Sequence, residues 1–598
     1  MNAVDETYRD ATLPVAERVE NLLGQMTLEE KAGLFFHTMI TMGENGELAG
    51  PNTAFDMPGT SDYVVDKHMS HLNLFGMAPS GRELAEWHNR IQELAASTRL
   101  GIPMTISTDP RHHFSENPGA AMLAGPFSQW PEALGFGAIG DAELVEKFGD
   151  IARQEYTAVG LRVALHPQID LATEPRWSRQ VATFGENAEL TSALGAAYIR
   201  GFQGSALGDQ SVATMTKHFP GGGPQKDGED PHFAYGREQV YPGDMFEYHL
   251  QPFEAAIAAG SSQMMPYYGM PIGTEYEEVG FGFNKSVITG LLRTRFGFDG
   301  IVCTDWGLLS DAVVMGEPFP ARAWGVEHLS VEERMLTVIE AGTDQFGGEE
   351  IPEMLVSLVR SGRIDESRID QSARRLLREK FVLGLFDNPF VDVEKADTIV
   401  GRADFIAAGE AAQRAAITVL AHGDGTPTLP LSRGVKLYVE GIAPEVAARF
   451  GEVVDTPDEA DVAIVRVGTP YEVRETFFEN YFHAGSLEFA PEQVERLTAL
   501  AKVVPTVIDV FLDRAAVLTP FHGVAALVGD FGASGEAVLD VLFGVVQPQG
   551  RLPIELPSSM AAVEASRPDV PSDTAAPLFR FGHGLTIGQP QEAVVEAH

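Results

Sequence analysis

A carboxylate beside an indole is the first feature of this sequence that could carry out chemistry. The segment FGFDGIVCTDWGLL places Asp305 at the end of an apolar run, directly before Trp306. Such a carboxylate can act as a nucleophile, a base or a metal ligand, and an indole ring packs well against the apolar face of a sugar. A structural interpretation also exists, with Asp305 capping a helix and Trp306 in the core. This segment alone leaves both interpretations open.

Groups that could hold sugar hydroxyls recur in three further segments. KHFPGGG offers Lys217 and His218, STDPRHHF offers Asp109, and EPRWSR offers Arg176 and Arg179. The planar guanidinium donates in a fork that suits vicinal hydroxyls or a carboxylate. The glycine turn of KHFPGGG lacks the GxxxxGK[ST] spacing of a phosphate loop, so we do not expect nucleotide binding there. Structural ion pairs and turns are the alternative for each segment.

Metal binding is disfavoured by the spacing of the histidines and cysteines. His112 and His113 have no HExxH pattern around them, and the single cysteine, Cys303, excludes an internal disulfide and a cysteine-based zinc site. The acidic loop KDGEDPHF lacks the spacing of an EF-hand. Its His232 either belongs to a solvated loop or forms a catalytic pair with an aspartate. We expect no metal site.

These residues stand at the ends of apolar, β-rich runs separated by amphipathic helical patterns. The runs cover residues 103–108, 161–167, 212–219, 262–268 and 300–306. Strand and helix alternating over so many residues predict a (β/α)₈-type barrel in an α/β chain, which we place at residues 1–388. Active sites of such barrels lie at the carboxyl ends of the strands. The sequence therefore predicts one site made from several strand ends.

A second alternating pattern follows the barrel. Residues 389–404 lose periodicity and are predicted to be a linker, and residues 405–598 are predicted to form an α/β sandwich domain. Its apolar runs cover 435–441, 461–468, 504–512 and 524–532. The Ala-, Ser- and Pro-rich segment 558–577 is predicted to be an exposed excursion, and FRFGHGL at 579–585 a final strand.

Composition narrows the classes of partner. The 598 residues include 43 basic and 85 acidic side chains, a net charge of −42, which disfavours nucleic acid and anionic membranes as partners. No apolar run approaches the length of a membrane span. The polar N-terminus carries no export signal, so we expect a cytoplasmic protein.

Several motifs occur together in an order that identifies a family. They are QMTLEEKAGL, WPEALGFGA, EPRWSR with FGEN, KHFPGGG, FGFDGIVCTDWG, GRLPIELP and FRFGHGL. With them the chain resembles glycoside hydrolase family 3, the retaining exo-acting β-glucosidases and their relatives, from about residue 8 to residue 585. The resemblance implies a barrel, an α/β sandwich and no cofactor. Many members add a fibronectin-type third domain after the last motif, and we expect this chain to lack it.

The resemblance also assigns roles to residues that match its motifs. Asp305 is expected to be the nucleophile, and the following residues are expected to bind the substrate: Asp109, Arg176, Lys217, His218, Tyr268 and Trp306. Tyr267 competes with Tyr268 for the tyrosine position. The strand then continues into GMPIGTEYEEVGFG instead of an Asn-rich turn, a departure that leaves substrate preference open.

The acid/base is expected to be Glu472, supplied by the second domain. In the family this residue is a Glu shortly after a strand that ends in VG, and here the strand is DVAIVRVG, followed by the loop TPYEVRETFFENYFHAG. Glu475, Glu479 and Glu488 lie in the same acidic stretch. Arg474 could hold Glu472 in a surface ion pair instead.

We therefore expect a hydrolase that releases a terminal β-D-glucosyl residue from a small-molecule or oligosaccharide β-glycoside. The family also contains β-xylosidases, α-L-arabinofuranosidases and β-N-acetylglucosaminidases. The last group uses KHFPGHGxxxxDxH, whereas here Gly222 replaces the second histidine and Asp230 and His232 come two places late. A non-catalytic carbohydrate-binding homologue and a barrel metalloenzyme are further alternatives for the function. For the oligomeric state, a homodimer is the alternative to a monomer.

Overall fold

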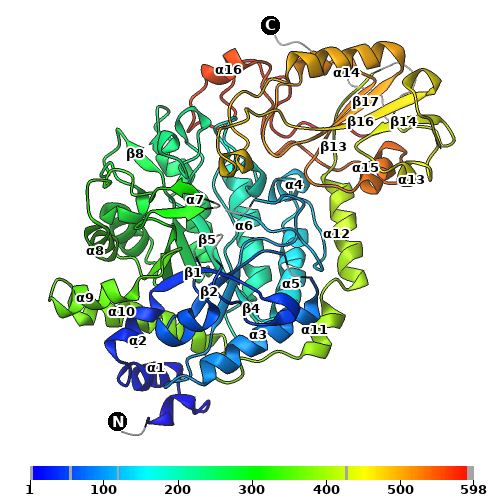
Figure 1. The fold of residues 1–598 in the computed structure, drawn as a ribbon. Coiled ribbons are helices and arrows are strands. Elements are labelled where there is room, and N and C mark those ends of the chain that lie inside the picture. Colours follow the sequence, from blue (N-terminus) through cyan, green and yellow to red (C-terminus); the bar gives the residue numbers. More distant parts are fainter. Residues whose placement is uncertain are drawn as a thin grey trace.

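The first two-thirds of the chain forms a closed barrel of parallel strands (Figure 1). The computed structural model describes residues 4–52, 57–77, 79–117, 120–314, 316–423 and 429–588. In these residues eight strands pair in the order β1-β12-β9-β7-β5-β4-β3-β2. Their bounds are β1 Phe36–Thr41, β2 His71–Phe75, β3 Thr105–Thr108, β4 Leu161–Ala164, β5 Ala213–Phe219, β7 Gln263–Pro266, β9 Ile301–Trp306 and β12 Gln345–Gly347. The predicted (β/α)₈-type barrel is confirmed.

The barrel strands form where the sequence supplies runs that can be buried on both faces. Every residue of β5 is buried, as expected for a parallel strand with side chains in the barrel interior on one face and helices on the other. All five predicted runs contain one of these strands. β1, β2 and β12 were not singled out, because β1 and β2 are interrupted by polar residues and β12 has three residues.

Amphipathic helices cover the barrel, and α5 (Ala142–Ala158), α6 (Ala188–Gln203) and α7 (Phe246–Ala258) pack in succession around it. Asp141 caps the start of α5, and its side chain accepts hydrogen bonds from the first-turn amides of Glu143 and Leu144. Gly149 of α5 lies against Gly201 of α6 so closely that an added Cβ would meet the Gly201 backbone at 2.9 Å. The helices thus hold the strands, and with them the strand ends, in fixed positions.

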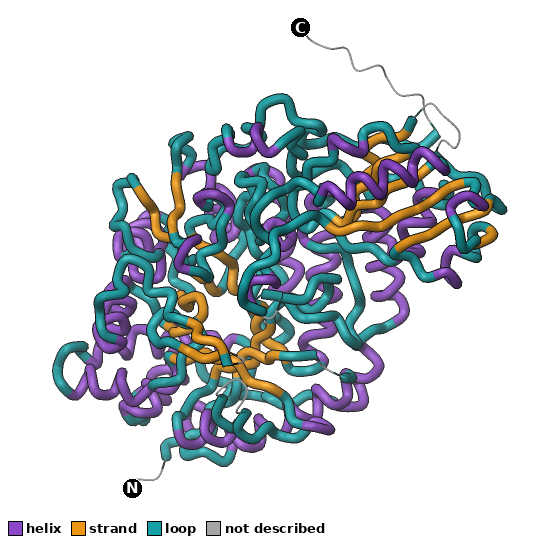
Figure 2. The backbone as a smooth tube through the Cα atoms, turned by 45° about the horizontal axis from the view of Figure 1, so that its top comes forward, coloured by secondary structure: helices purple, strands orange, loops and turns teal. Residues whose placement is uncertain are grey.

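The second domain is a six-stranded sheet between helices, the predicted α/β sandwich (Figures 1 and 2). Its order is β13-β18-β17-β16-β14-β15, and only β13 is antiparallel to its neighbour. Alternate residues of β16 enter two separate cores. Ala463 and Val465 pack with α14, and Val462 and Ile464 pack with α15. The bounds are β13 Thr418–His422, β14 Lys436–Glu440, β15 Glu452–Val453, β16 Val462–Gly468, β17 Thr506–Phe511, β18 Ala526–Asp530, α14 Pro491–Val503 and α15 Gly535–Leu542.

The segment predicted as a linker, 389–404, is largely helical. It contains α11 (Val393–Ile399) and the start of α12 (Ala403–Ala416). Asp392 caps α11 by accepting hydrogen bonds from two first-turn amides, and the helix packs against α3 (Gly81–Ala96) and α5. These helices could not be predicted from the sequence because the segment is too short for its periodicity to show, while its cap and packing still stabilise a helix.

The predicted exposed excursion, 558–577, instead docks on the barrel. It contains α16 (Met560–Glu564), and the fully buried Asp569 accepts hydrogen bonds from the backbone amides of Gly243 and Met245 at 2.8 and 2.9 Å. FRFGHGL forms no strand. Within this segment, Phe579 and Leu585 make isolated bridges to Leu556 and Val419.

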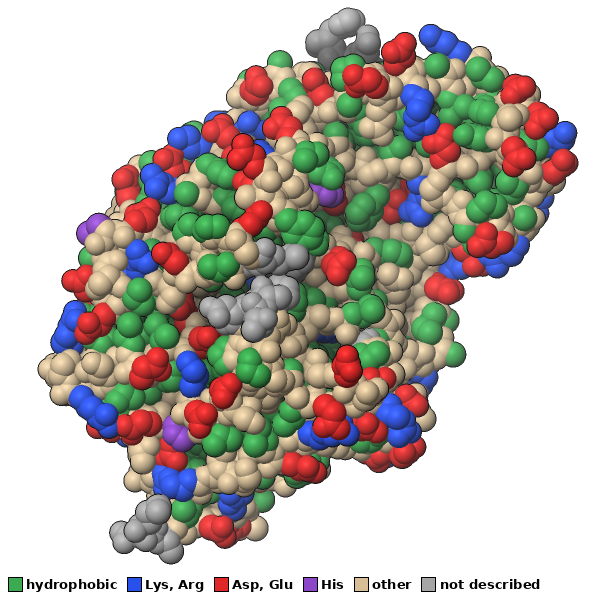
Figure 3. Space-filling model, viewed as in Figure 1, with side chains coloured by type: hydrophobic (Ala, Val, Ile, Leu, Met, Phe, Trp, Pro, Cys, Tyr) green, Lys and Arg blue, Asp and Glu red, His purple; other side chains and the backbone are tan. Residues whose placement is uncertain are grey.

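Charged side chains of both signs occur on one face of the molecule (Figure 3). On the face seen in Figure 3, acidic and basic side chains are interspersed and do not gather into a patch of one sign. Within the described ranges, no helix is long and apolar enough to cross a membrane.

Candidate active site

A cavity of about 600 Å³ opens at the carboxyl ends of the barrel strands. Most of the residues predicted to form the site line it: Asp109, Lys217, Tyr268, Asp305 and Trp306. They come from the ends of four different strands, β3, β5, β7 and β9. The barrel thus brings together side chains that lie up to about two hundred residues apart in the sequence.

Asp305, at the end of β9, has a carboxylate oxygen that no described residue hydrogen-bonds. Its Oδ1 accepts a hydrogen bond from the Trp306 amide at 2.9 Å. Its Oδ2 is buried and has no hydrogen-bond partner among the described residues, and the Nε2 atom of His218 lies 3.8 Å away. Since a buried carboxylate oxygen normally finds a donor, this exception indicates a functional position.

Asp109 is held between an amide and an ammonium group. Its Oδ2 accepts a hydrogen bond from Asn73 Nδ2 at 3.1 Å, and its Oδ1 lies 3.4 Å from Lys217 Nζ. Burial lowers the pKa of Lys217, and the nearby carboxylates of Asp109 and Asp305 oppose that shift. This buried pair can both accept from and donate to a sugar hydroxyl.

His218 is oriented by Asp170. Its Nδ1 lies 2.8 Å from Asp170 Oδ2, and the same carboxylate accepts the backbone amides of His218 and Gly222. Nε2 of His218 therefore faces Asp305, and Arg179 lies 3.4 Å from it. Gly222 leaves no room for a side chain, because a Cβ there would come within 2.7 Å of the Tyr267 ring.

Arg176 does not line this cavity. Its guanidinium donates two hydrogen bonds to Glu174, at 2.9 and 3.0 Å. Arg179, three residues later, is the arginine buried beside His218, where it also donates to Gln168. The sequence signal was present in EPRWSR, which contains both arginines, but spacing alone could not say which one turns inward.

The adjacent tyrosines divide their roles. Tyr268 lines the cavity, and its hydroxyl both donates to the carbonyl of Trp306 and accepts from its amide, at 2.9 Å each. Tyr267 is buried behind the cavity, and its hydroxyl donates to Asp230 at 3.4 Å. Tyr268 thus fixes the backbone that carries Trp306.

His232 is a cavity residue for which the sequence offered only competing interpretations. Its Nδ1 lies 2.6 Å from Asp230 Oδ1, and its ring contacts Tyr268 at 4.7 Å between centroids. Burial lowers the pKa of His232, an effect opposed by Asp230. With Nδ1 engaged by Asp230, Nε2 is the nitrogen left for a bound molecule. Across the part of the chain that the structure describes, no three His, Cys, Asp or Glu side chains cluster as a metal site would require.

The second domain reaches the cavity with aromatic residues. Phe477, Phe478 and Tyr481 line it. Glu472 lies elsewhere on the same loop. Its side chain is 58% exposed, accepts a hydrogen bond from the Ser486 amide and lies 3.9 Å from Arg474.

Glu479 is also engaged outside the cavity. The hydroxyl of Tyr235 donates to it at 2.8 Å, and the amide of Thr476 donates at 3.0 Å. Neither Glu472 nor Glu479 therefore faces Asp305 in this conformation.

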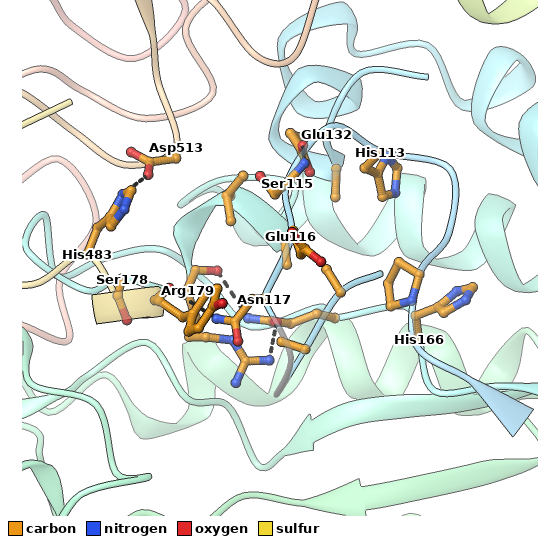
Figure 4. A pocket seen from close by; sticks show the side chains of 18 of the residues that line it. His113, Ser115, Glu116, Asn117, Glu132, His166, Ser178, Arg179, His483 and Asp513 are labelled. Carbon is orange, nitrogen blue, oxygen red and sulfur yellow. Dashed lines mark hydrogen bonds and ion pairs between the residues drawn. The ribbon is translucent and has the colours of Figure 1, made fainter. Parts of the chain in front are cut away.

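A smaller cavity of about 250 Å³ lies between the two domains (Figure 4). Lys217 and Tyr481 line both cavities, so the two spaces adjoin. On the second-domain side His483 pairs with Asp513, and on the barrel side Arg179 points into the space. The space next to the Asp305 cavity is thus lined by residues of both domains.

Comparison with known protein families identifies the family of this chain. Residues 46–379, the barrel, match the family model described as the glycosyl hydrolase family 3 N terminal domain. The chain belongs to glycosyl hydrolase family 3. The resemblance inferred from the motifs is confirmed, and this family 3 chain is a glycoside hydrolase.

Whole-chain relatives agree with this membership. The chain is 53% identical to "Probable beta-glucosidase C" of Aspergillus flavus over 98% of this chain and 92% of the relative. It is 41% identical to the "Periplasmic beta-glucosidase/beta-xylosidase" of Dickeya chrysanthemi over 97% and 91%. The fold matches an exo-1,3/1,4-beta-glucanase from a Pseudoalteromonas species with a TM-score of 0.77 at 21% identity, over 96% of each chain.

Proposed function

We propose that this family 3 hydrolase releases the terminal non-reducing β-D-glucosyl residue from β-glucosides with retention of configuration. The observation that carries the proposal is the buried Oδ2 of Asp305, which has no hydrogen-bond partner among the described residues and lies beside Trp306 in a cavity that can hold a sugar. The names of the Aspergillus flavus and Dickeya chrysanthemi relatives support glucose as the sugar.

The reaction follows from the position of Asp305. Its Oδ2 forms a bond to the anomeric carbon while the bond to the leaving oxygen breaks and that oxygen takes a proton from the acid. Water, deprotonated by the same group, then displaces Asp305 and regenerates its carboxylate. Asp109, Lys217, His218 and Arg179 supply the acceptors and donors that hold the sugar hydroxyls. We assign to Arg179 the role that the family resemblance implied for Arg176.

His232, held by Asp230, is the acid/base that the geometry supports best. It lines the cavity that contains Asp305, whereas Glu472 is 58% exposed and bonded to its own loop. Since burial lowers the pKa of His232 below its ordinary 6.5, the donor form is lost as pH rises through that lowered value. Hydrolysis of substrates with poor leaving groups should therefore decline on the alkaline side of this pKa.

The function is tested by a substrate panel. Purified enzyme is assayed with phenyl β-glucoside, phenyl β-xyloside, phenyl N-acetyl-β-glucosaminide and long β-glucans, and the first product is observed by NMR. We expect β-glucose as the first product and no mid-chain cleavage. Preference for the xyloside would favour the second activity named for the Dickeya chrysanthemi relative. Inversion would remove Asp305 as nucleophile.

The acid/base assignment is tested by comparing His232→Ala with Glu472→Ala. Loss of the acid should slow phenyl β-glucoside far more than a 2,4-dinitrophenyl glucoside, whose leaving group needs no proton. Azide should restore activity to the same variant, with a β-glucosyl azide as the product. If Glu472→Ala shows both effects and His232→Ala shows neither, the acid/base is Glu472 and its loop must move to reach the sugar.

Sedimentation of the same preparation distinguishes a monomer from the homodimer left open by the sequence.

A further inference from the structure

A further cavity, of about 570 Å³, lies at the end of the barrel opposite Asp305. Its walls come from η8 (Ser286–Arg295), α8 (Val331–Ala341) and α10 (Glu366–Val382), together with the segments next to them. Arg293 lines it and donates a hydrogen bond to the carbonyl of Gly300, directly before β9 begins, whereas Asp305 lies near the carboxyl end of that strand. The cavity is therefore separate from the site of hydrolysis.

Cationic side chains gather in this cavity, although the chain has a net charge of −42. The described lining contains two carboxylates, those of Glu340 and Asp365, and Asp365 caps α10 by accepting the amide of Ser367. Like charges brought together repel one another, so such a cluster in an acidic protein requires an explanation. The five cations are Lys285, Arg293, Arg363, Arg368 and Arg375.

Three of these arginines surround a single buried carboxylate. Asp344 is fully buried and pairs with Arg293 and with Arg375, whose Nη1 lies 3.1 Å from its Oδ1. Arg375 also pairs with the exposed Asp299. Burial lowers the pKa of Arg368, and the charges of Arg375 and Arg293 lower it further, against the effect of Asp344. The three guanidinium groups thus lie close enough to repel one another.

Arg368 is held in place by groups that do not neutralise it. Its Nη1 donates to Ser372 Oγ at 2.7 Å, and its Nη2 donates to the carbonyls of Thr343 and Ile339 at 2.7 and 3.1 Å. Across the residues that the structure describes, no carboxylate oxygen lies within 4.0 Å of a nitrogen of Arg368, nor of Nζ of the exposed Lys285. Two fixed or accessible charges therefore remain for a ligand.

The arrangement of the donors favours a tetrahedral oxyanion. A guanidinium fork suits a carboxylate or a phosphate, but a planar carboxylate offers only two oxygens, whereas these cations come from several separate segments. A phosphate group carries a charge of about −1.5 to −2 and three acceptor oxygens, which can meet several cations at once.

The size and lining of the cavity indicate a small ligand. Its volume falls within the range of small-molecule sites, roughly 300–1,000 Å³. None of the described lining residues is aromatic, so no ring is there to stack a nucleotide base. We propose that this cavity is a binding site for phosphate, either inorganic phosphate or the phosphate group of a small organic ester. This inference goes beyond the proposed function and does not depend on it.

The test measures binding to the full chain by isothermal titration calorimetry. The probes are inorganic phosphate, glycerol 3-phosphate, citrate and glycerol. We expect saturable binding of a phosphate probe and none of glycerol. Tighter binding of glycerol 3-phosphate identifies an ester as the ligand, and equal or tighter binding of inorganic phosphate identifies the free anion. Arg368→Ala and Lys285→Glu should each weaken the preferred phosphate probe about 10- to 100-fold, the loss of a charge-assisted contact.

A control on the same helix makes the test specific. Arg374→Ala removes an α10 arginine that pairs with Glu20 outside this cavity, and it should leave the affinity at the wild-type value. In Lys285→Glu, kcat/KM for phenyl β-glucoside should be unchanged, because the cavity lies at the other end of the barrel.

Three results would overturn the proposal. They are no binding of either phosphate probe to wild type, tighter binding of citrate than of both, and unchanged affinity in folded Arg368→Ala. If Arg368→Ala does not fold, the exposed Lys285→Glu and Arg363→Ala sites decide by the same measurement, and unchanged affinity in both overturns it. Failure of wild type on every β-glucoside would refute the proposed function alone, since binding here is measured without hydrolysis.

Discussion

Asp109→Asn probes how the site holds its sugar. Each oxygen of Asp109 has one protein partner, Asn73 at 3.1 Å and Lys217 at 3.4 Å, and a carboxylate oxygen can accept two hydrogen bonds. One acceptor direction per oxygen therefore remains for substrate. Asparagine keeps one acceptor oxygen, so Asp109→Asn removes one hydrogen bond to a charged group, which contributes about 1.5–3 kcal/mol. This corresponds to a fall of roughly 10- to 150-fold in kcat/KM.

The assay for Asp109→Asn is steady-state kinetics on phenyl β-glucoside with a thermal melt of the same sample. We expect kcat and kcat/KM to fall together, since contacts to the hydroxyls tighten as the ring flattens toward the transition state. Asp311→Asn is the matched control, because Asp311 lines the same cavity but is exposed and accepts the amide of Ala321. A folded Asp109→Asn that loses less than about ten-fold, or that changes KM alone, would refute this reasoning.

Further outcomes follow from other parts of the structure. Arg179→Lys should lower kcat/KM more than Arg176→Lys, because only Arg179 lies beside His218. Equal losses in kinetic assays would contradict the assignment of sugar binding to Arg179 in place of Arg176. Burial raises the pKa of Glu186 to about 7, so the folded state favours its protonated form and loses at most about 3 kcal/mol as pH rises from 4.5 to 7. In thermal melts across that pH range, the Tm of Glu186→Gln should fall less steeply with pH than the Tm of wild type. An equally steep fall would contradict the raised pKa of Glu186. Asp569→Ala leaves two partly buried amides without this acceptor and should speed proteolysis of the 558–577 segment. Unchanged proteolysis would show that docking of the segment does not depend on Asp569. Dialysis against a chelator should leave kcat unchanged, and a loss restored by a divalent metal would indicate a metal site.

The barrel could be predicted because its strands are visible to periodicity. β5 and β9 are runs buried on both faces with charged residues near their carboxyl ends. They predicted both the fold class and the position of Asp305. Short elements gave no such signal. β12 has three residues, and α11 depends on a cap at Asp392 and on packing against α3 and α5.

The site could be predicted where a residue follows a strand directly. Asp109, Lys217 and Asp305 lie at strand ends, so the barrel topology fixes where they meet. The orientation of loop side chains depends on contacts that the sequence does not show. Arg176 turns to Glu174, and Glu472 bonds to the amide of Ser486, so neither lines the cavity.

Covalent trapping tests the central claim, that Asp305 is the nucleophile, most directly. The enzyme is incubated with 2,4-dinitrophenyl 2-deoxy-2-fluoro-β-glucoside, digested and analysed by mass spectrometry. The free Oδ2 of Asp305 predicts one fluoroglucosyl group per chain, on the peptide that contains Asp305, and none in Asp305→Ala. Stoichiometric label on a different carboxylate, or trapping that persists in Asp305→Ala, would contradict the assignment.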